Sequence, residues 1–253
     1  MKSEKSKFKI LENLKGYLIF LIILIAWYIV CEMKVWNAYI LPPPQKVFET
    51  FLKMLKDGSI FINIYVSMKR VLIGFFISAM IGIPLGIFFG MCNSIYEYFK
   101  PLFNFFRNTP PLALIPMLIL WFGIGEKSKI IIIILASFFP IFTSTLKLIE
   151  VGKAFELSNM QIILKIIIPS AVLDIAVGLK LALGYSFRAI IGAELVAASS
   201  GLGYLISDGK EMSRTDVVIV GIIVIGILGI LCDYIFSILV KKVSRGKSVE
   251  AYE

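Results

Sequence analysis

Between residues 171 and 196, an otherwise apolar stretch carries Lys180, Arg188 and Glu194 beyond Asp174, which lies near its beginning. A charge at the centre of a bilayer costs at least about 2.5 kcal/mol, so such residues usually face a cavity or a partner of opposite charge. An arginine cannot lose its proton to escape that cost. The chemistry open to these residues is therefore electrostatic: attraction of an anionic solute, or a structural ion pair.

Arg188 is the sharpest of these candidates, and two interpretations of it stay open. If its helix begins near Ala171, Arg188 lies about 26 Å along the axis. It either lines a cavity and attracts an anion, or pairs with a carboxylate or carbonyl on another span. Glu194 lies six positions further on, about 240° around the helix, so the two do not share a face. Lys180 is expected to extend its long side chain toward the membrane surface.

The composition argues against an enzyme and against a metal or cofactor site. The chain has 253 residues, no histidine and three cysteines that stand singly, at Cys31, Cys92 and Cys232. This is not the spacing of a metal site, and no paired carboxylates or Ser/His set appear. Residues 246–248 read Gly-Lys-Ser but lack the upstream glycine of a phosphate loop. Any energy for work must come from another chain.

The balance of apolar and charged residues predicts a polytopic α-helical membrane protein. Hydrophobic residues make up 58% of the chain and charged residues 17%, which is outside the usual range of soluble domains. A span needs about 20 apolar residues, so the chain has room for about six spans and for no large extramembrane domain. The net charge of +9 comes mainly from tails and loops, and without a basic face rich in aromatic residues it does not predict nucleic-acid binding.

Charge and periodicity divide the chain into three parts. Basic tails at 1–15 and 241–253 flank a transmembrane domain at 16–240, and they predict a multi-pass protein of a prokaryotic cell (inner) membrane with both termini in the cytoplasm. After three prolines, the amphipathic segment 45–57 is expected to lie along the lipid interface or against the bundle, with an apolar stripe of Phe48, Phe51, Leu52 and Leu55. The expected spans are 16–31, 71–91, 98–122, 130–146, 171–196 and 217–240.

Glycines and prolines inside these spans predict packing and breaks. Gly82, Gly86 and Gly90 stand four residues apart, a spacing that lets two helices approach closely. Pro110, Pro111 and Pro116 should break the third span, and such breaks persist in lipid only where protein or a cavity satisfies the freed carbonyls. We therefore expect Pro111 and Pro116, with Arg188 and Glu194, along a substrate pathway.

The segment 147–169 is the one cytoplasmic loop with a readable helix start. Residues 158–161, Ser-Asn-Met-Gln, form a capping box, so we expect two short helices that meet near residue 157. Such a projection is either a docking surface for a partner or an ordinary ordered loop.

This loop and four other segments resemble the MetI-like permease subunits of binding-protein-dependent ATP-binding-cassette importers. The resemblance lies in the branch that serves sulfonates, taurine, nitrate and thiamine-precursor pyrimidines. Its segments are ILPPPQKVF at 40–48, GIPLG at 82–86, PPLALIPMLILWFGIGEKSKI at 110–130 and AELVAASSGLGYLI at 193–206. Anchored on Pro169, the family's loop motif places Glu150 on its glutamate, whereas Glu156 stands where the family has glycine.

The resemblance implies a non-enzymatic transport subunit. Two copies would form a homodimer in membrane lipid, with a central pathway that is loaded by an extracytoplasmic solute-binding protein and driven by two copies of a cytoplasmic ATPase. The residues implied for the ATPase contact are Glu150, Val151, Gly152, Lys153, Ala154, Phe155, Glu156 and Leu157. The alternative is an ion-coupled secondary transporter, which broken helices and an intramembrane arginine could also serve.

Overall fold

The computed structural model describes residues 18–154 and 175–243, and the regular elements in this part of the chain are all helical. Four helical stretches are long and apolar enough to cross a membrane, and a fifth candidate consists of two helices joined by a bend of 85°. The predicted all-α membrane fold is thus confirmed, with four or five candidate spans in the described residues where about six were expected.

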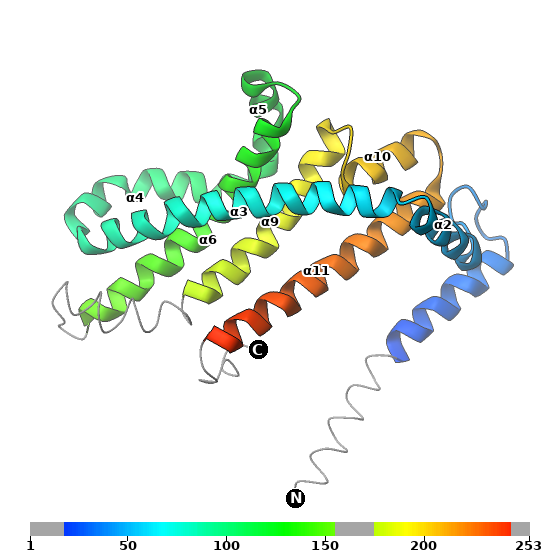
Figure 1. Cartoon of the computed structure of the whole chain (residues 1–253), viewed down its shortest axis with the longest axis horizontal. Helices are drawn as coiled ribbons and strands as arrows, with labels where there is room; N and C mark the ends of the chain where they lie inside the picture. The colour runs from blue at the N-terminus through cyan, green and yellow to red at the C-terminus, as the bar shows by residue number, and fades with distance from the viewer. Residues whose placement is uncertain (1–17, 155–174, 244–253) are drawn as a thin grey trace, which may run out of the picture.

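The elements follow one another along the bundle in Figure 1. In chain order they are Leu18–Glu32, α2 (Pro44–Lys56), α3 (Ser59–Met91), α4 (Asn93–Asn108), the 3-10 turn η1 (Pro111–Leu114), α5 (Ile115–Phe122), α6 (Glu126–Ala154), α9 (Ala176–Ala197), α10 (Leu202–Glu211) and α11 (Thr215–Val243). The four long candidates are α3, α6, α9 continuing into α10, and α11. Leu18–Glu32 is apolar but shorter.

The centre of the bundle is the parallel pair α3 and α6. Glycines of α3 face branched side chains of α6 in one continuous register: Gly74 faces Ile133, Gly82 faces Ile141, Gly86 faces Thr145 and Gly90 faces Ile149. Because both sequences advance together, the two helices run in the same direction. The close approach predicted from the glycine spacing is confirmed.

The third central helix, α9, runs antiparallel to α6. Its first turns meet the middle of α6, where Gly178 lies against Ser144, and its last turns meet the beginning of α6. Val71, Ile133 and Ile190 bring all three helices into one buried cluster. A side chain that points into this cluster from one helix is therefore enclosed by the other two.

The predicted break in the third span occurs at Pro110 and Pro111. Helix α4 ends at Asn108, and the chain then turns through 85° into η1 and α5; Figure 1 shows α5 standing away from the other helices. Pro116 does not interrupt a helix, because it occupies the first turn of α5, where a missing N–H has no intrahelical partner to lose.

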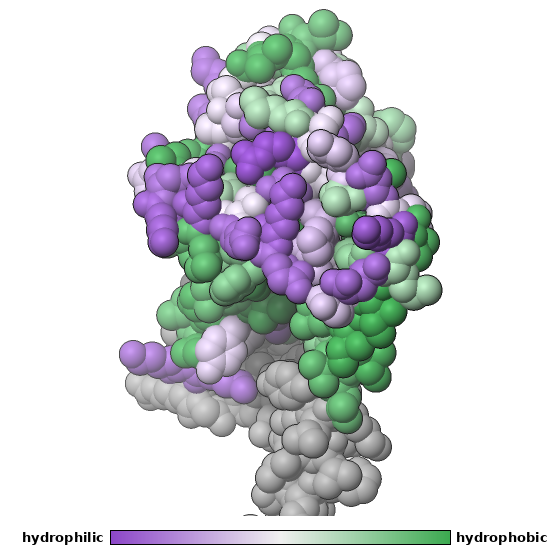
Figure 2. Space-filling view, turned by 90° about the vertical axis from the view of Figure 1, so that its right-hand side faces the viewer, coloured by the Kyte–Doolittle hydropathy of each residue, from purple (hydrophilic) through white to green (hydrophobic). Residues whose placement is uncertain are grey.

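Helix α2 covers the predicted amphipathic segment, but it is rotated so that Phe51 and Leu55 of the expected stripe pack against the bundle while Phe48 and Leu52 do not. The buried residues are Val47, Thr50 and Met54, whereas Phe48 is 60% exposed. Thr50 determines this rotation, because its hydroxyl donates to the Asp216 carboxylate at 2.7 Å. The charged face of α2 points outward, at the end of the molecule where Figure 2 shows hydrophilic side chains gathered.

Two helices extend beyond the predicted spans. Helix α3 begins at Ser59, twelve residues before Val71, so it carries polar residues into the bundle. Residues 147–154, expected as the first part of the cytoplasmic loop, are helical and continue α6, where Leu148, Ile149 and Gly152 are buried. The rest of the predicted loop lies outside the described residues.

Both ends of the described chain lie on the same side as the C-terminal end of α6. Trp27 donates to the Pro42 carbonyl at 3.1 Å, which fixes the end of the first helix beside α2. Because Asp216 also bonds to α2, helix α11 starts on that same side and ends on the other. Leu18, Ala154 and Val243 therefore share the side drawn lowest in Figure 1.

Gly86→Ala should lower the free energy of unfolding by about 1–3 kcal/mol relative to a matched control, which is the usual cost of overpacking. A Cβ at Gly86 would lie 2.7 Å from Cβ of Thr145 and 3.0 Å from the Phe142 carbonyl oxygen. The control is Gly226→Ala in α11, where nothing lies within 4 Å of the new Cβ, so only the helix-propensity gain of about 1 kcal/mol applies. Unfolding of the purified chain in detergent measures both, and equal stability of the two variants would contradict the close contact.

Candidate functional site

A cavity of about 470 Å³ lies between α4, η1, α6 and α9. Its wall includes Arg107 in the last turn of α4, Pro111 of η1, Pro140 of α6 and Arg188 of α9. The break after α4 positions this wall, because the chain leaves α4 at Asn108 and turns away from the helix axis. The irregular backbone thus borders a partly open cavity, at which Arg107 and Arg188 are both exposed; at membrane depth such backbone is tolerated where it lines a cavity.

Arg188 brings positive charge to this cavity. Its guanidinium carbon lies 5.7 Å from the centre of the Tyr185 ring, a cation–π contact that orients the side chain. Among the described residues, no carboxylate forms an ion pair with Arg188 within 4.0 Å. The neighbouring Lys180 differs, since it lies 3.3 Å from the Asp233 carboxylate and forms an ion pair, where the sequence predicted only extension toward the surface.

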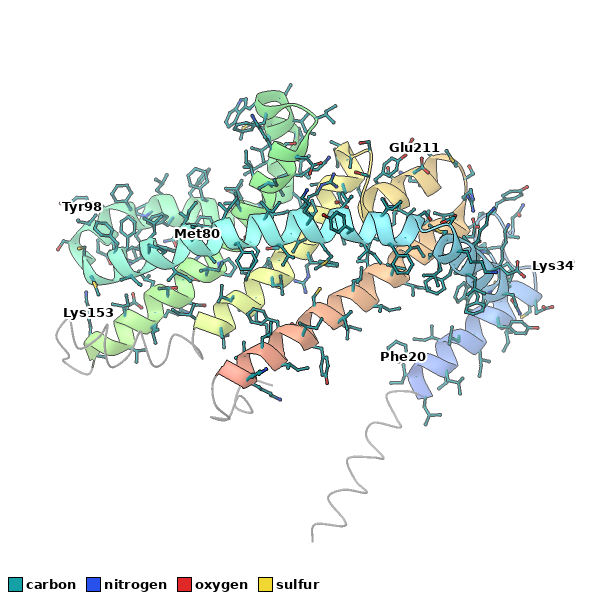
Figure 3. All side chains as sticks on the ribbon, in the orientation of Figure 1. Phe20, Lys34, Met80, Tyr98, Lys153 and Glu211 are labelled. Carbon is teal, nitrogen blue, oxygen red and sulfur yellow. The ribbon has the colours of Figure 1, made fainter. Side chains whose placement is uncertain are left out.

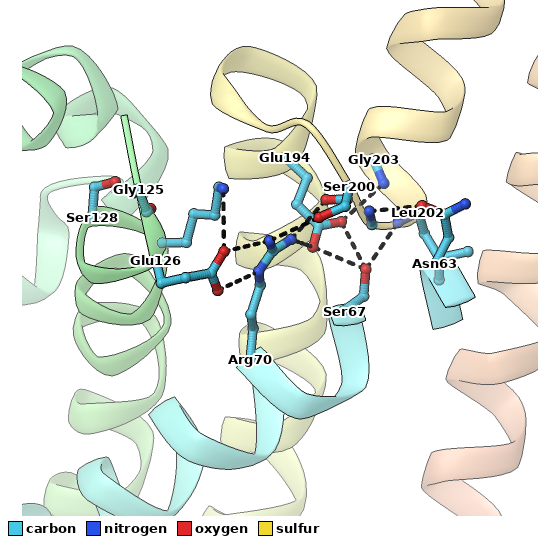
Figure 4. Close-up of polar contacts among 12 residues, drawn as sticks. Asn63, Ser67, Arg70, Gly125, Glu126, Ser128, Glu194, Ser200, Leu202 and Gly203 are labelled. Carbon is cyan, nitrogen blue, oxygen red and sulfur yellow. Dashed lines mark hydrogen bonds and ion pairs between the residues drawn. The ribbon is translucent and has the colours of Figure 1, made fainter. Parts of the chain in front are cut away.

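A second polar centre surrounds Arg70 of α3 (Figure 4). Arg70 is 3% exposed. Its Nε and Nη2 donate to the Glu126 carboxylate at 2.8 and 2.5 Å, and its Nη1 donates to Glu194 at 2.7 Å. This fork of charge-assisted hydrogen bonds joins α3 to the start of α6 and to the end of α9.

Glu194 is 1% exposed and is fully engaged in this centre. The Ser67 hydroxyl lies 2.8 and 2.9 Å from its two oxygens, and the N–H of Gly203 donates to it at 3.0 Å. Nearby, the N–H of Gly201 donates to the side-chain carbonyl of Asn63 at 2.8 Å. Gly201 has φ of 114°, which requires glycine. The connection between α9 and α10 is thereby attached to α3.

Two of the four predicted pathway residues line the cavity. Pro111 and Arg188 belong to its wall, whereas Pro116 lies in α5 outside the lining set. Glu194 lies in the buried centre around Arg70. Arg107 and Arg70 are functional candidates that the sequence did not predict. Each is a cation with apolar residues around it in its helix, and this contrast could have identified both.

The predicted ATPase contact begins in the last turns of α6. Glu150 and Val151 are exposed, and Gly152 is buried. The ammonium of Lys153 donates to the Met91 carbonyl at 3.1 Å, which fastens this end of α6 to the end of α3. Phe155, Glu156 and Leu157 lie outside the described residues.

Within residues 18–154 and 175–243, no group of three His, Cys, Asp or Glu side chains could hold a metal ion. The carboxylates that do enter the bundle already face cations or hydroxyl donors. The described residues therefore provide two features: a positively charged cavity, and a cluster around Arg70 in which the charges compensate one another.

Comparison with known proteins gives a family and several relatives. Residues 82–245 match the family described as "Binding-protein-dependent transport system inner membrane component". The chain is 34% identical over 243 residues to the putative aliphatic sulfonates transport permease protein SsuC of Bacillus subtilis (strain 168), covering 93% of this chain and 88% of that protein. It is 33% identical over 225 residues to the taurine transport system permease protein TauC of Escherichia coli (strain K12), covering 84% and 82%. The nitrate import permease protein NrtB of Synechocystis sp. (strain ATCC 27184 / PCC 6803 / Kazusa) is 30% identical over 235 residues, covering 86% and 84%.

Arg70→Ala should destabilise the protein by about 3 kcal/mol or more, because it leaves the Glu194 carboxylate buried without its counter-charge. The control is Lys100→Ala. Lys100 pairs with Glu97 at 3.0 Å, and both side chains are about half exposed, so its loss should cost at most about 1 kcal/mol. Thermal unfolding of the purified chain in detergent compares the two variants. If Arg70→Ala unfolds at the temperature of the control, the buried centre does not stabilise the fold.

Proposed function

Because this chain belongs to the family of inner membrane components of binding-protein-dependent transport systems, we propose that it carries a small oxyanion across the membrane. It is a multi-pass permease subunit of an ATP-binding-cassette importer. A transporter of this kind includes an ATPase and a solute-binding protein as further subunits. The relatives are described as permeases for aliphatic sulfonates, taurine and nitrate, which share a small anionic group.

Arg188 is the observation that supports an anion over a neutral pyrimidine. Arg70, Lys129 and Lys180 each have a carboxylate within 4.0 Å, so their charges are compensated inside the protein. Arg188 has no such partner among the described residues and borders a cavity. A charge kept at membrane depth without a protein partner is a functional candidate by default, and here an anionic solute would complete it.

The secondary-transporter alternative is weaker on the same ground. Proton-coupled transporters commonly relay protons through intramembrane Asp, Glu or His side chains. In the described residues, Glu194 is held by Arg70 and Asp233 by Lys180. With these two carboxylates engaged, the described part of the chain offers little with which to couple an ion gradient, which favours energy from an ATPase.

We infer that two copies assemble around a central pathway. Several large apolar side chains project from the bundle in Figure 3, among them Met80 of α3 at 76% exposed and Tyr98 of α4 at 87% exposed. In one copy these faces need lipid or another helix against them. A homodimer would also bring two cavities to face one another across the shared pathway.

The ATPase contact is proposed at residues 150–157, on the side that also holds Leu18 and Val243. This orientation places both termini in the cytoplasm, which agrees with the basic residues of the two tails. The bond from Lys153 to the Met91 carbonyl supports the assignment, because a docking segment fastened to two spans can pass a displacement to both of them.

Arg188→Ala should reduce uptake of an anionic solute at least about tenfold, since a hydrogen bond to a charged group contributes about 1.5–3 kcal/mol. The measurement is uptake of a sulfonate or nitrate by proteoliposomes that contain the complete transporter and its binding protein. Lys180→Gln is the control, because that lysine belongs to a half-exposed surface pair. Uptake by the wild type that continues after the ATPase is inactivated would reject the importer mechanism.

Glu150→Ala should weaken binding of the ATPase at least about tenfold, because losing one partner of a charged pair at an interface costs about 2–5 kcal/mol. Pull-down of the ATPase by the purified permease measures this. Glu156→Gly, which restores the family residue, should also weaken binding if Glu156 makes a contact of its own, and should be neutral if it only occupies the turn. Glu97→Ala serves as a control, since Glu97 is an exposed carboxylate paired with Lys100 on α4. If Glu150→Ala binds the ATPase as tightly as the wild type does, Glu150 is not part of the ATPase contact. The support that this contact gives to the cytoplasmic orientation is then lost.

A further inference from the structure

Two arginines from different elements border the same cavity. Arg107 belongs to the last turn of α4, and Arg188 stands in the middle of α9. Neither forms an ion pair within the described part of the chain. Two guanidinium groups at one cavity provide ten N–H donors and a charge of +2, which an anion can neutralise.

The position of Arg107 has a simpler explanation that must be weighed, since a basic residue is favourable at the C-terminal end of any helix. That end of α4 is already capped, however. The N–H of Thr109 donates to the carbonyls of Phe105 and Phe106 at 3.1 and 3.2 Å, and its hydroxyl donates to Phe105 at 2.9 Å. Two of the four terminal carbonyls, those of Phe105 and Phe106, are therefore satisfied without the guanidinium.

The positive character of the cavity comes from the arginines alone. Two threonines also border it, Thr109 and Thr143, but the hydroxyl of Thr143 donates to the Phe139 carbonyl at 2.7 Å and that of Thr109 to Phe105. Their protons are thus committed to backbone. The side-chain donors left for an anion in the cavity are the guanidinium groups of Arg107 and Arg188 and the hydroxyl of Tyr185, which also lines the wall, and only the two arginines bring charge.

The rest of the wall is largely apolar and carries no carboxylate. Leu135, Phe139 and Leu181 are typical of it. Such a wall suits a short hydrocarbon chain, whereas an ammonium group would lose its hydration there without gaining a counter-charge. The volume of about 470 Å³ is that of a small-molecule site.

We propose that Arg107 and Arg188 form a binding site for the head of an oxyanion that carries a short apolar tail, as an alkanesulfonate does. The proposal rests on the transport function above and narrows its substrate class. Nitrate has no tail for the apolar wall, and an aminosulfonate such as taurine ends in an ammonium that finds no carboxylate there. A guanidinium can donate two parallel hydrogen bonds to two oxygens of one sulfonate, whereas a lysine ammonium acts as a point charge.

The test is direct binding to the complete transporter in nanodiscs, without the binding protein, so that only the permease site is measured. Butane-1-sulfonate is the probe, with 2-aminoethanesulfonate and nitrate as comparisons. We expect the wild type to bind butane-1-sulfonate at least about tenfold more tightly than either comparison. Arg107→Gln and Arg188→Gln should each weaken that binding at least about tenfold, and Arg107→Lys should restore only part of it. Lys180→Gln should bind as the wild type does, and retained assembly with the ATPase shows that each variant is folded.

Several outcomes would overturn the site. Equal binding of butane-1-sulfonate and 2-aminoethanesulfonate would reject the apolar subsite, and unchanged binding by Arg107→Gln would remove that arginine. A phospholipid also has an oxyanion head and apolar tails. If the two arginine variants lose bound phosphatidylglycerol, detected by native mass spectrometry, but keep their affinity for butane-1-sulfonate, the site belongs to lipid.

ATP-dependent uptake separates the two proposals, and it is measured after the same purified transporters are reconstituted into proteoliposomes together with the binding protein. Suppose that the wild type takes up butane-1-sulfonate, 2-aminoethanesulfonate or nitrate, but Arg107→Gln binds the probe unchanged. This result rejects only the binding site at Arg107 and Arg188. Absence of ATP-dependent uptake for all three anions rejects the transport function itself.

Discussion

The guanidinium of Arg70 is the group on which the arrangement of the central helices depends. It is buried in a protein that must avoid isolated charge, and it is tolerated because Glu126 of α6 and Glu194 of α9 both accept its hydrogen bonds. Since the three residues come from three helices, the requirement to neutralise one charge fixes the mutual position of all three. The close glycine contacts along α3 and α6 then hold the two helices together over most of their length.

Helix α6 connects the features that transport would require. It starts at Glu126, whose exposed carboxylate pairs with the buried Arg70. It contributes Leu135, Phe139 and Pro140 to the cavity wall, and it ends near Lys153, which is bonded to α3. At 1.5 Å per residue, this 29-residue helix is about 43 Å long. On the proposed function, a displacement applied by an ATPase near Glu150 therefore acts on the same rigid element that forms part of the solute cavity.

The sequence predicted features that depend on local pattern and missed those that depend on distant pairing. The stripe of Gly82, Gly86 and Gly90 and the break at Pro111 follow from periodicity and backbone chemistry, so they could be read directly. Arg70 was missed because the second span was expected to start one residue later, at Val71. Even a correct boundary would not have identified its partner Glu194, which lies 124 positions away in sequence, because pattern within one helix says nothing of which helices become neighbours.

The same limit explains why Arg188 could be recognised and its role could not. An arginine in an apolar window is visible in any sequence, but whether a carboxylate meets it is a property of the assembled bundle. The described residues separate two kinds of intramembrane cation. Arg70 and Lys180 form ion pairs with carboxylates, so their charges are compensated within the protein. Arg107 and Arg188 share a cavity instead. Because an uncompensated charge at membrane depth is costly, a cation that the fold leaves without a carboxylate is favoured only if something else completes it, and in a permease the solute is a partner that can arrive and leave.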